Sequence, residues 1–131
     1  MFRKFLLILL ITSYFSGSSQ EIIQCRVLTS EGDIDIELYP ERAPVTVSNF
    51  LKYVDGNLYK DSSFFRVCNE RNESDRTVKI GVIQGGDVPA EKELAPIALE
   101  STKETGILHK DGIVSMARAE PNSATCSFFI C

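Results

Sequence analysis

The stretch Ser115–Ile130, SMARAEPNSATCSFFI, decides the fold of this chain. One apolar run begins at Ile113 and ends within this stretch, at Met116. A second apolar run, residues 128–130, forms the end of the stretch. Between the two runs lies a loop of small residues that contains Pro121, and such residues interrupt regular structure. The stretch therefore predicts a strand, an exposed loop and a second strand.

A hairpin and a helix are predicted earlier in the chain. Residues 33–38 alternate acidic and apolar side chains, with the period of two that is typical of a strand with one buried face. An apolar segment at 22–28 and a turn at 29–33 complete the hairpin. The helix begins near Pro44, which suits a first-turn position. Its apolar stripe consists of Val47, Phe50, Leu51 and Val54.

Several short motifs follow one another in a distinctive order. They are the segments 43–50 and 56–59, then Phe64-Phe65-Arg66-Val67, then Gln84-Gly85-Gly86-Asp87, and finally the stretch 115–130. Together they resemble the cyclophilin-type peptidyl-prolyl isomerases over about residues 23 to 131. The resemblance implies a mostly β fold, a cyclophilin-like antiparallel β-barrel with a capping helix.

A complete cyclophilin continues beyond the position of Cys131. We therefore expect the last strands and the second helix of the family to be absent from this chain, with an unpaired sheet edge as the consequence. We interpret the chain as a C-terminally truncated relative of the family. One alternative is an inactive fragment that does not fold stably.

Arg66 is the catalytic residue that the resemblance implies. An X–Pro bond resists rotation because its nitrogen lone pair is delocalised, with a barrier of about 18–20 kcal/mol. The twisted transition state returns that lone pair to nitrogen, and a cation that donates a hydrogen bond there accelerates rotation by stabilising this state selectively. A guanidinium suits this role because it stays charged and holds its donors in a rigid fork. The alternative is a solvated arginine on the wet face of a sheet.

The resemblance also implies a set of substrate-binding residues. These are Gln84, Val82, Ala117, Arg118 and Phe129. The Gln84 amide would hold the substrate backbone, and Ala117 and the backbone of Arg118 would border it. Phe129 would form the floor of the proline pocket. Rotation about a bond makes and breaks no covalent bond, so no cofactor and no metal are expected.

Two features fit the family pattern less closely. Gly81 stands where many relatives place an aromatic wall of the pocket, which Val82 only partly replaces. Residues 67–83 separate Arg66 from Gln84, more than in most cyclophilins, and the polar segment 68–77 is typical of an exposed loop insertion. It includes a weak glycosylation sequon at 72–74.

Two further expectations concern the segment before the final motif. A strand is expected near Ile97–Glu100, by analogy with the family. His109 precedes Asp111-Gly112, where a histidine is more consistent with a hydrogen bond to nearby backbone than with catalysis.

Composition limits the classes of function. A chain of 131 residues is one domain at most, and its formal net charge of −4 argues against a nucleic-acid partner. We predict proline-containing polypeptides as substrates and a monomeric state. The alternative function is a non-catalytic, chaperone-like module that binds proline-containing peptides.

The first residues have the parts of a secretory signal peptide. Arg3 and Lys4 precede the apolar run 5–11, and small residues follow at 16–19. We predict a signal peptide at 1–19, an incomplete cyclophilin-like domain at 20–131, and export to the periplasm or outside the cell. The alternative is a membrane anchor formed by an uncleaved signal, although a spanning helix needs about 20 apolar residues.

Export would expose the four cysteines to oxidising conditions. Four cysteines allow three disulfide pairings, and buried thiols that act as small apolar side chains are an equal alternative. The cysteines in question are Cys25, Cys68, Cys126 and Cys131.

Overall fold

The structure is a computed structural model that describes residues 20–73 and 77–131. Its elements are β1 (Ile23–Thr29), β2 (Gly32–Leu38), α1 (Pro44–Asp55), β3 (Phe64–Cys68), β4 (Val82–Gly85), the 3-10 helix η1 (Ala90–Lys92), α2 (Thr102–Thr105), β5 (Val114–Met116) and β6 (Phe128–Ile130). The prediction of a mostly β fold is confirmed. The predicted signal peptide at 1–19 lies outside the described residues.

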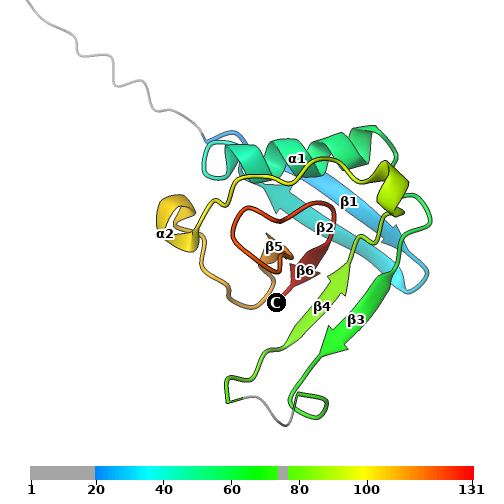
Figure 1. Cartoon of the computed structure of the whole chain (residues 1–131), viewed down its shortest axis with the longest axis vertical. Helices are drawn as coiled ribbons and strands as arrows, with labels where there is room; N and C mark the ends of the chain where they lie inside the picture. Colours follow the sequence, from blue (N-terminus) through cyan, green and yellow to red (C-terminus); the bar gives the residue numbers. More distant parts are fainter. Residues whose placement is uncertain (1–19, 74–76) are drawn as a thin grey trace, which may run out of the picture.

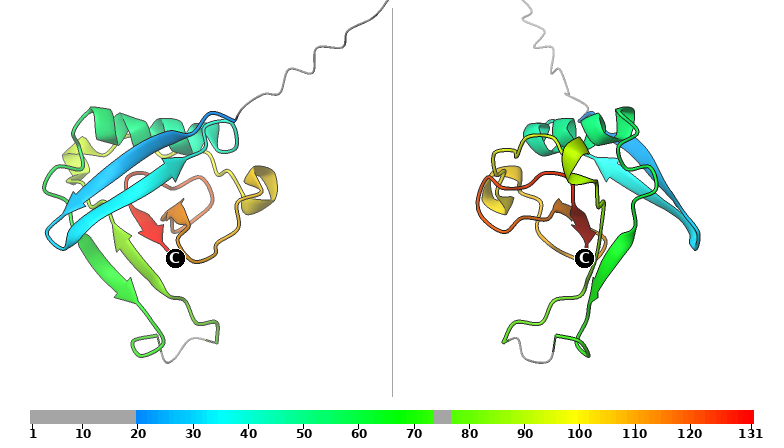
Figure 2. Two further views of the ribbon diagram at one scale, coloured as in Figure 1. Left: turned by 180° about the vertical axis from the view of Figure 1, so that it is seen from behind. Right: turned by 45° about the vertical axis from the view of Figure 1, so that its right-hand side comes forward.

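The described strands form two antiparallel sheets. β1 and β2 make the predicted hairpin, and the remaining strands have the order β3-β4-β6-β5. Figure 1 shows α1 at one end of the molecule beside the β1–β2 hairpin, with β3 and β4 extending away from it. The two views of Figure 2 show the same β3–β4 hairpin projecting from the body of the protein. Cys68, the first residue of the predicted loop insertion 68–77, is the buried last residue of β3, and the rest of the insertion follows this strand.

The main core joins the hairpin, the helix and the four-stranded sheet. Its buried residues are Ile36, Leu38, Val47, Phe50 and Phe128. The alternation predicted for β2 brings its apolar side chains inward, and Val47 and Phe50 of the predicted α1 stripe supply the opposing surface. Val54, the last residue of that stripe, is 40% exposed, so this part of the prediction is wrong. Phe128 attaches the final motif to this core, because its ring packs edge-on against that of Phe50.

Helix α1 begins at Pro44, as the sequence predicts, but it is capped from a distant segment. The N-cap residue Ala43 has no side chain that can accept a hydrogen bond. Instead, the carboxylate of Glu100 accepts the N–H of Val45 at 2.9 Å and that of Thr46 at 2.7 Å. These two bonds satisfy donors that a helix leaves unpaired in its first turn. They also fix the segment after β4 to the start of α1.

The strand expected at Ile97–Glu100 is not formed, and this expectation is wrong. Only Ile97 pairs, in a single bridge with Ala124. The N–H of Leu99 donates to the side-chain Oδ1 of Asn122 at 2.8 Å, and Glu100 is engaged by the helix. Because the Asn122 side chain accepts the hydrogen bond from the N–H of Leu99, the strand pairing ends after the single bridge at Ile97.

Candidate active site

The candidate catalytic residues lie in one row across the four-stranded sheet. Arg66 is opposite Gln84, Gln84 is opposite Phe129, and Phe129 is opposite Ser115. Side chains directly opposite each other on antiparallel strands point to the same face. Three of the predicted site residues, from three motifs far apart in the sequence, therefore share one face of the sheet.

The neighbouring row points to the opposite face, toward the core. Phe64 is opposite Gly85, Gly85 is opposite Phe128, and Phe128 is opposite Met116. The rings of Phe64 and Phe128 meet edge-on with centroids 6.0 Å apart. The sheet thus separates a packed inner row from the candidate catalytic row.

A β-bulge in β3 makes this separation possible. In a regular strand, residues two apart point to the same face. The pairing shifts between Phe64 and Arg66, so Phe64 faces the core with Gly85 while Arg66 faces outward with Gln84. Bulges commonly redirect a side chain next to a functional site. Alternation along the sequence alone does not reveal this change.

Two acceptors contact the guanidinium of Arg66. Its Nη1 donates to Oε1 of Gln84 at 3.4 Å, and its Nη2 lies 3.7 Å from Oε1 of Glu73. The Arg66 side chain is 45% exposed. It is therefore held at the surface of the sheet, on β3, and is accessible to a peptide.

The two glycines after Gln84 permit close packing behind the site. A Cβ at Gly85 would lie 2.8 Å from the Phe64 ring, and one at Gly86 would lie 2.9 Å from the Phe128 ring. Gly86 also has a φ of 78°, which L side chains rarely adopt. The two glycines therefore shape the backbone behind the site.

Phe128 and Phe129 have different surroundings, although they are adjacent. Phe128 is 5% exposed and belongs to the core. Phe129 is half-buried, and the ring of His109 stacks on it with a centroid separation of 5.6 Å. The aromatic contact of His109 was not predicted, because the two residues lie on separate segments and no local pattern links them.

A cavity of about 500 Å³ borders the Phe129 end of the row. Phe129, His109, Met116 and Arg118 contribute to its wall, together with the segment 97–102. Arg66 and Gln84 do not line it. The cavity therefore adjoins the row at Phe129 and not at the guanidinium, and we assign the candidate catalytic position to the row of side chains.

Ala117 and Arg118 follow β5 directly. The N–H of Ala117 donates to the carbonyl of Ser127 at 2.8 Å. This donor is used within the fold, so a substrate hydrogen bond at Ala117 requires its carbonyl. Arg118 is exposed and leaves its backbone at the edge of the cavity.

The expected weakness of the pocket wall is visible at Gly81. Nothing lies within 4 Å of the position that a Cβ would occupy there. Val82 is half-buried and lies opposite Cys68, on the same face as Arg66. Of these two positions, only Val82 has an apolar side chain on the face that carries Arg66.

Among residues 20–73 and 77–131, no three histidine, cysteine or acidic side chains gather into a possible metal site. Neither helix of these ranges has the length and apolar composition of a membrane span. No disulfide joins the four cysteines, all of which the structure describes.

Comparison with known proteins decides the family. The family model for cyclophilin-type peptidyl-prolyl cis-trans isomerases matches residues 24–131. The chain belongs to the cyclophilin family. It is 36% identical over 105 residues to a peptidyl-prolyl cis-trans isomerase of Acinetobacter baylyi, with 78% of this chain and 50% of the relative covered. It is 37% identical over 107 residues to peptidyl-prolyl cis-trans isomerase B of Escherichia coli, with 78% and 58% covered.

This cyclophilin spans about half the length of the curated relatives that it matches. The matched part contains every candidate site residue named above. It also contains Glu73, whose contact with Arg66 was not predicted from the sequence. An acidic residue in a polar insertion gives no signal of its position, because such segments lack a periodic pattern.

Proposed function

We propose that this cyclophilin catalyses cis–trans isomerisation of X–Pro peptide bonds, with Arg66 as the electrostatic catalyst. The observation that carries the proposal is the single row formed by Arg66, Gln84 and Phe129. β3 and β6 flank β4, so the backbones of Arg66 and Phe129 are roughly 10 Å apart. An extended peptide spans that distance with about three residues.

The row accounts for the chemical step. Phe129 offers an aromatic surface to the prolyl ring, and the Gln84 amide can accept and donate hydrogen bonds to the peptide backbone. Arg66 donates to the prolyl nitrogen as its lone pair returns during rotation. This hydrogen bond exists only in the twisted state, so it lowers the barrier without stabilising either planar form.

The test is exchange of cis and trans signals in a short X–Pro peptide, followed by NMR. We expect the wild-type chain to accelerate exchange and Arg66→Ala to reduce kcat/KM by about a hundredfold, the loss typical of a transition-state donor. Arg26→Ala is the matched control, because Arg26 is an exposed arginine that pairs with Asp35 in the other sheet. Equal rates for the two variants contradict the proposal.

A non-catalytic binder of proline-containing peptides is the second candidate. The open space at Gly81 favours it, because a missing pocket wall weakens the grip on the twisted prolyl ring. Saturable binding of the peptide with no acceleration of exchange identifies this function. A cooperative unfolding transition distinguishes both candidates from an inactive fragment that does not fold.

We also propose that the protein is exported and that it is a monomer. The charge and apolar pattern of the first 19 residues supports export, so the substrates are proline-containing polypeptides outside the cytoplasm. The protein acts as a monomer. Fractionation of cells that produce the full chain tests the first statement, and sedimentation analysis tests the second.

A further inference from the structure

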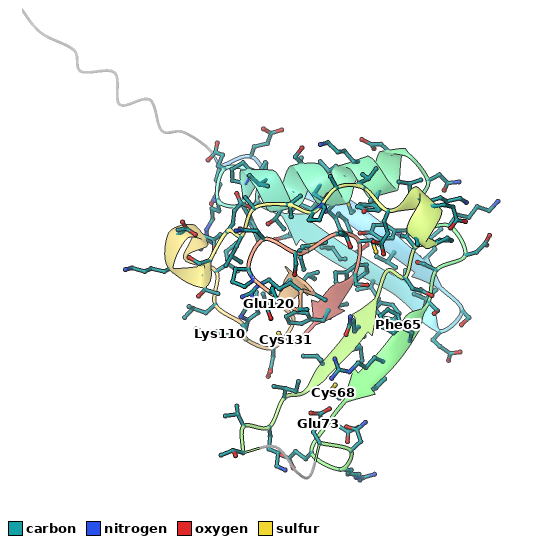
Figure 3. The ribbon with its side chains drawn as sticks, viewed as in Figure 1. Phe65, Cys68, Glu73, Lys110, Glu120 and Cys131 are labelled. Carbon is teal, nitrogen blue, oxygen red and sulfur yellow. The ribbon has the colours of Figure 1, made fainter. Side chains whose placement is uncertain are left out.

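The insertion after β3 brings a carboxylate to the candidate catalytic arginine. Oε1 of Glu73 lies 3.7 Å from Nη2 of Arg66. The Glu73 side chain is only 13% exposed, so it lies against the protein and not in solvent. Figure 3 shows Glu73 just beyond the end of β3. An acidic side chain of the insertion therefore belongs to the surroundings of the site.

The turn that carries Glu73 is built from two asparagines. Oδ1 of Asn69 accepts the N–H of Arg71 at 2.9 Å, and Oδ1 of Asn72 accepts the N–H of Asn69 at 2.7 Å. Nδ2 of Asn72 donates to the carbonyl of Val67 at 2.6 Å, which ties the turn to β3. The N–H of Glu73 donates to the carbonyl of Asn69 at 3.0 Å. These bonds fix the backbone from which Glu73 reaches Arg66.

We infer that Glu73 is a positioning residue for Arg66, an inference that rests on the proposed isomerase function. A guanidinium has five N–H donors in a rigid plane. Gln84 engages one terminal nitrogen and Glu73 lies beside the other, so the pair restricts rotation of this plane. The donors that remain are then directed toward the peptide before it binds. Orientation fixed in advance lowers the barrier to the chemical step.

The first measurement compares Glu73→Ala with Glu70→Ala. Glu70 is an exposed glutamate of the same turn region and serves as the charge-matched control. We expect Glu73→Ala to lower kcat for peptide isomerisation by about threefold to tenfold. KM should stay the same, because Phe129 and the peptide backbone contacts are untouched. Glu73→Gln keeps an acceptor oxygen and should recover part of kcat.

The second measurement does not depend on activity. Rotation about the Cζ–Nε bond of Arg66 is followed by NMR of ¹⁵N-labelled arginine at low temperature. Two acceptors on the terminal nitrogens should slow this rotation in the wild type, and Glu73→Ala should speed it while Glu70→Ala does not.

The outcomes separate the inference from the proposed function. An active wild type whose kcat is equally insensitive to both substitutions overturns the role of Glu73. A rise in KM equal to the fall in kcat also overturns it, because it indicates a general disturbance of peptide binding. An inactive wild type refutes the isomerase proposal, and in that case unchanged Arg66 rotation in Glu73→Ala overturns the positioning inference as well.

Discussion

Replacement of Phe128 or Phe129 by alanine should impair different properties of the protein, although the residues are adjacent. Phe128 is in the core row, 5% exposed, and Phe129 is in the candidate catalytic row. We expect Phe128→Ala to reduce the free energy of unfolding strongly. Phe129→Ala should mainly reduce isomerase activity, because it removes the surface offered to proline.

The structure gives the size of the two effects. Truncation of a buried phenylalanine to alanine costs about 3–5 kcal/mol. The Phe128 ring meets those of Phe50, Tyr59 and Phe64 edge-on, at centroid separations of 5.7, 5.8 and 6.0 Å. Such pairs add about 0.5–1.5 kcal/mol each beyond burial, so the loss belongs at the upper end of that range. Half-buried Phe129 loses one stacked contact, with His109, and should cost about 1–2 kcal/mol.

Urea unfolding followed by far-UV circular dichroism measures both losses. A domain of this kind is stable by about 5–15 kcal/mol, so Phe128→Ala removes a large share of its stability. Phe128→Leu keeps more apolar volume and provides a folded variant for the activity assay. It should isomerise a peptide at nearly the wild-type rate, while Phe129→Ala loses more than about tenfold in kcat/KM. Similar destabilisation by the two alanine substitutions would refute the assignment of the rows to opposite faces.

Two further substitutions test the packing around the site. Burial raises the pKa of the Tyr59 hydroxyl. Above about pH 10 the unfolded state therefore loses this proton while the folded state keeps it. The stability linked to Tyr59 is fully present below that pH and declines as the pH rises further. The urea midpoint should fall between about pH 10 and 11, the ordinary tyrosine range, and Tyr59→Phe should make this fall smaller. The same fall in wild type and variant would contradict the attribution of this pH dependence to Tyr59. Glu100→Gln replaces the carboxylate that caps α1 and should cost about 1–2 kcal/mol. Exposed Glu91→Gln is its control, and equal midpoints for the two variants would show that the cap contributes nothing.

The local elements of the fold could be predicted because their signals lie within a few residues. The alternation in β2 and the proline at the start of α1 each indicated an element that the structure contains. The expected strand at 97–100 failed for a reason that no local pattern carries. The strand is prevented by the side chain of Asn122, which accepts the hydrogen bond of Leu99 from a position 23 residues away in the sequence.

The site was predictable only in part, for the same physical reason. The motifs selected Arg66, Gln84 and Phe129, and the structure brings these three onto one face. Their roles in catalysis remain predictions that the substitutions above address. Glu73 and His109 could not be selected, because each acts through a partner on another segment and neither belongs to a periodic pattern.

The β-bulge at Phe64–Arg66 explains how an insertion can be accommodated next to the candidate catalytic residue. On the inner face, Phe64, Gly85 and Phe128 lock the register of three strands through close ring packing. The register of β3 and β4 therefore does not depend on the length of the loop that joins them. Additional residues after β3 can then change the outer face without moving the core. Glu73 reaches the outward-facing Arg66 from such a segment, so the insertion alters the surroundings of this arginine while the fold that carries it stays the same.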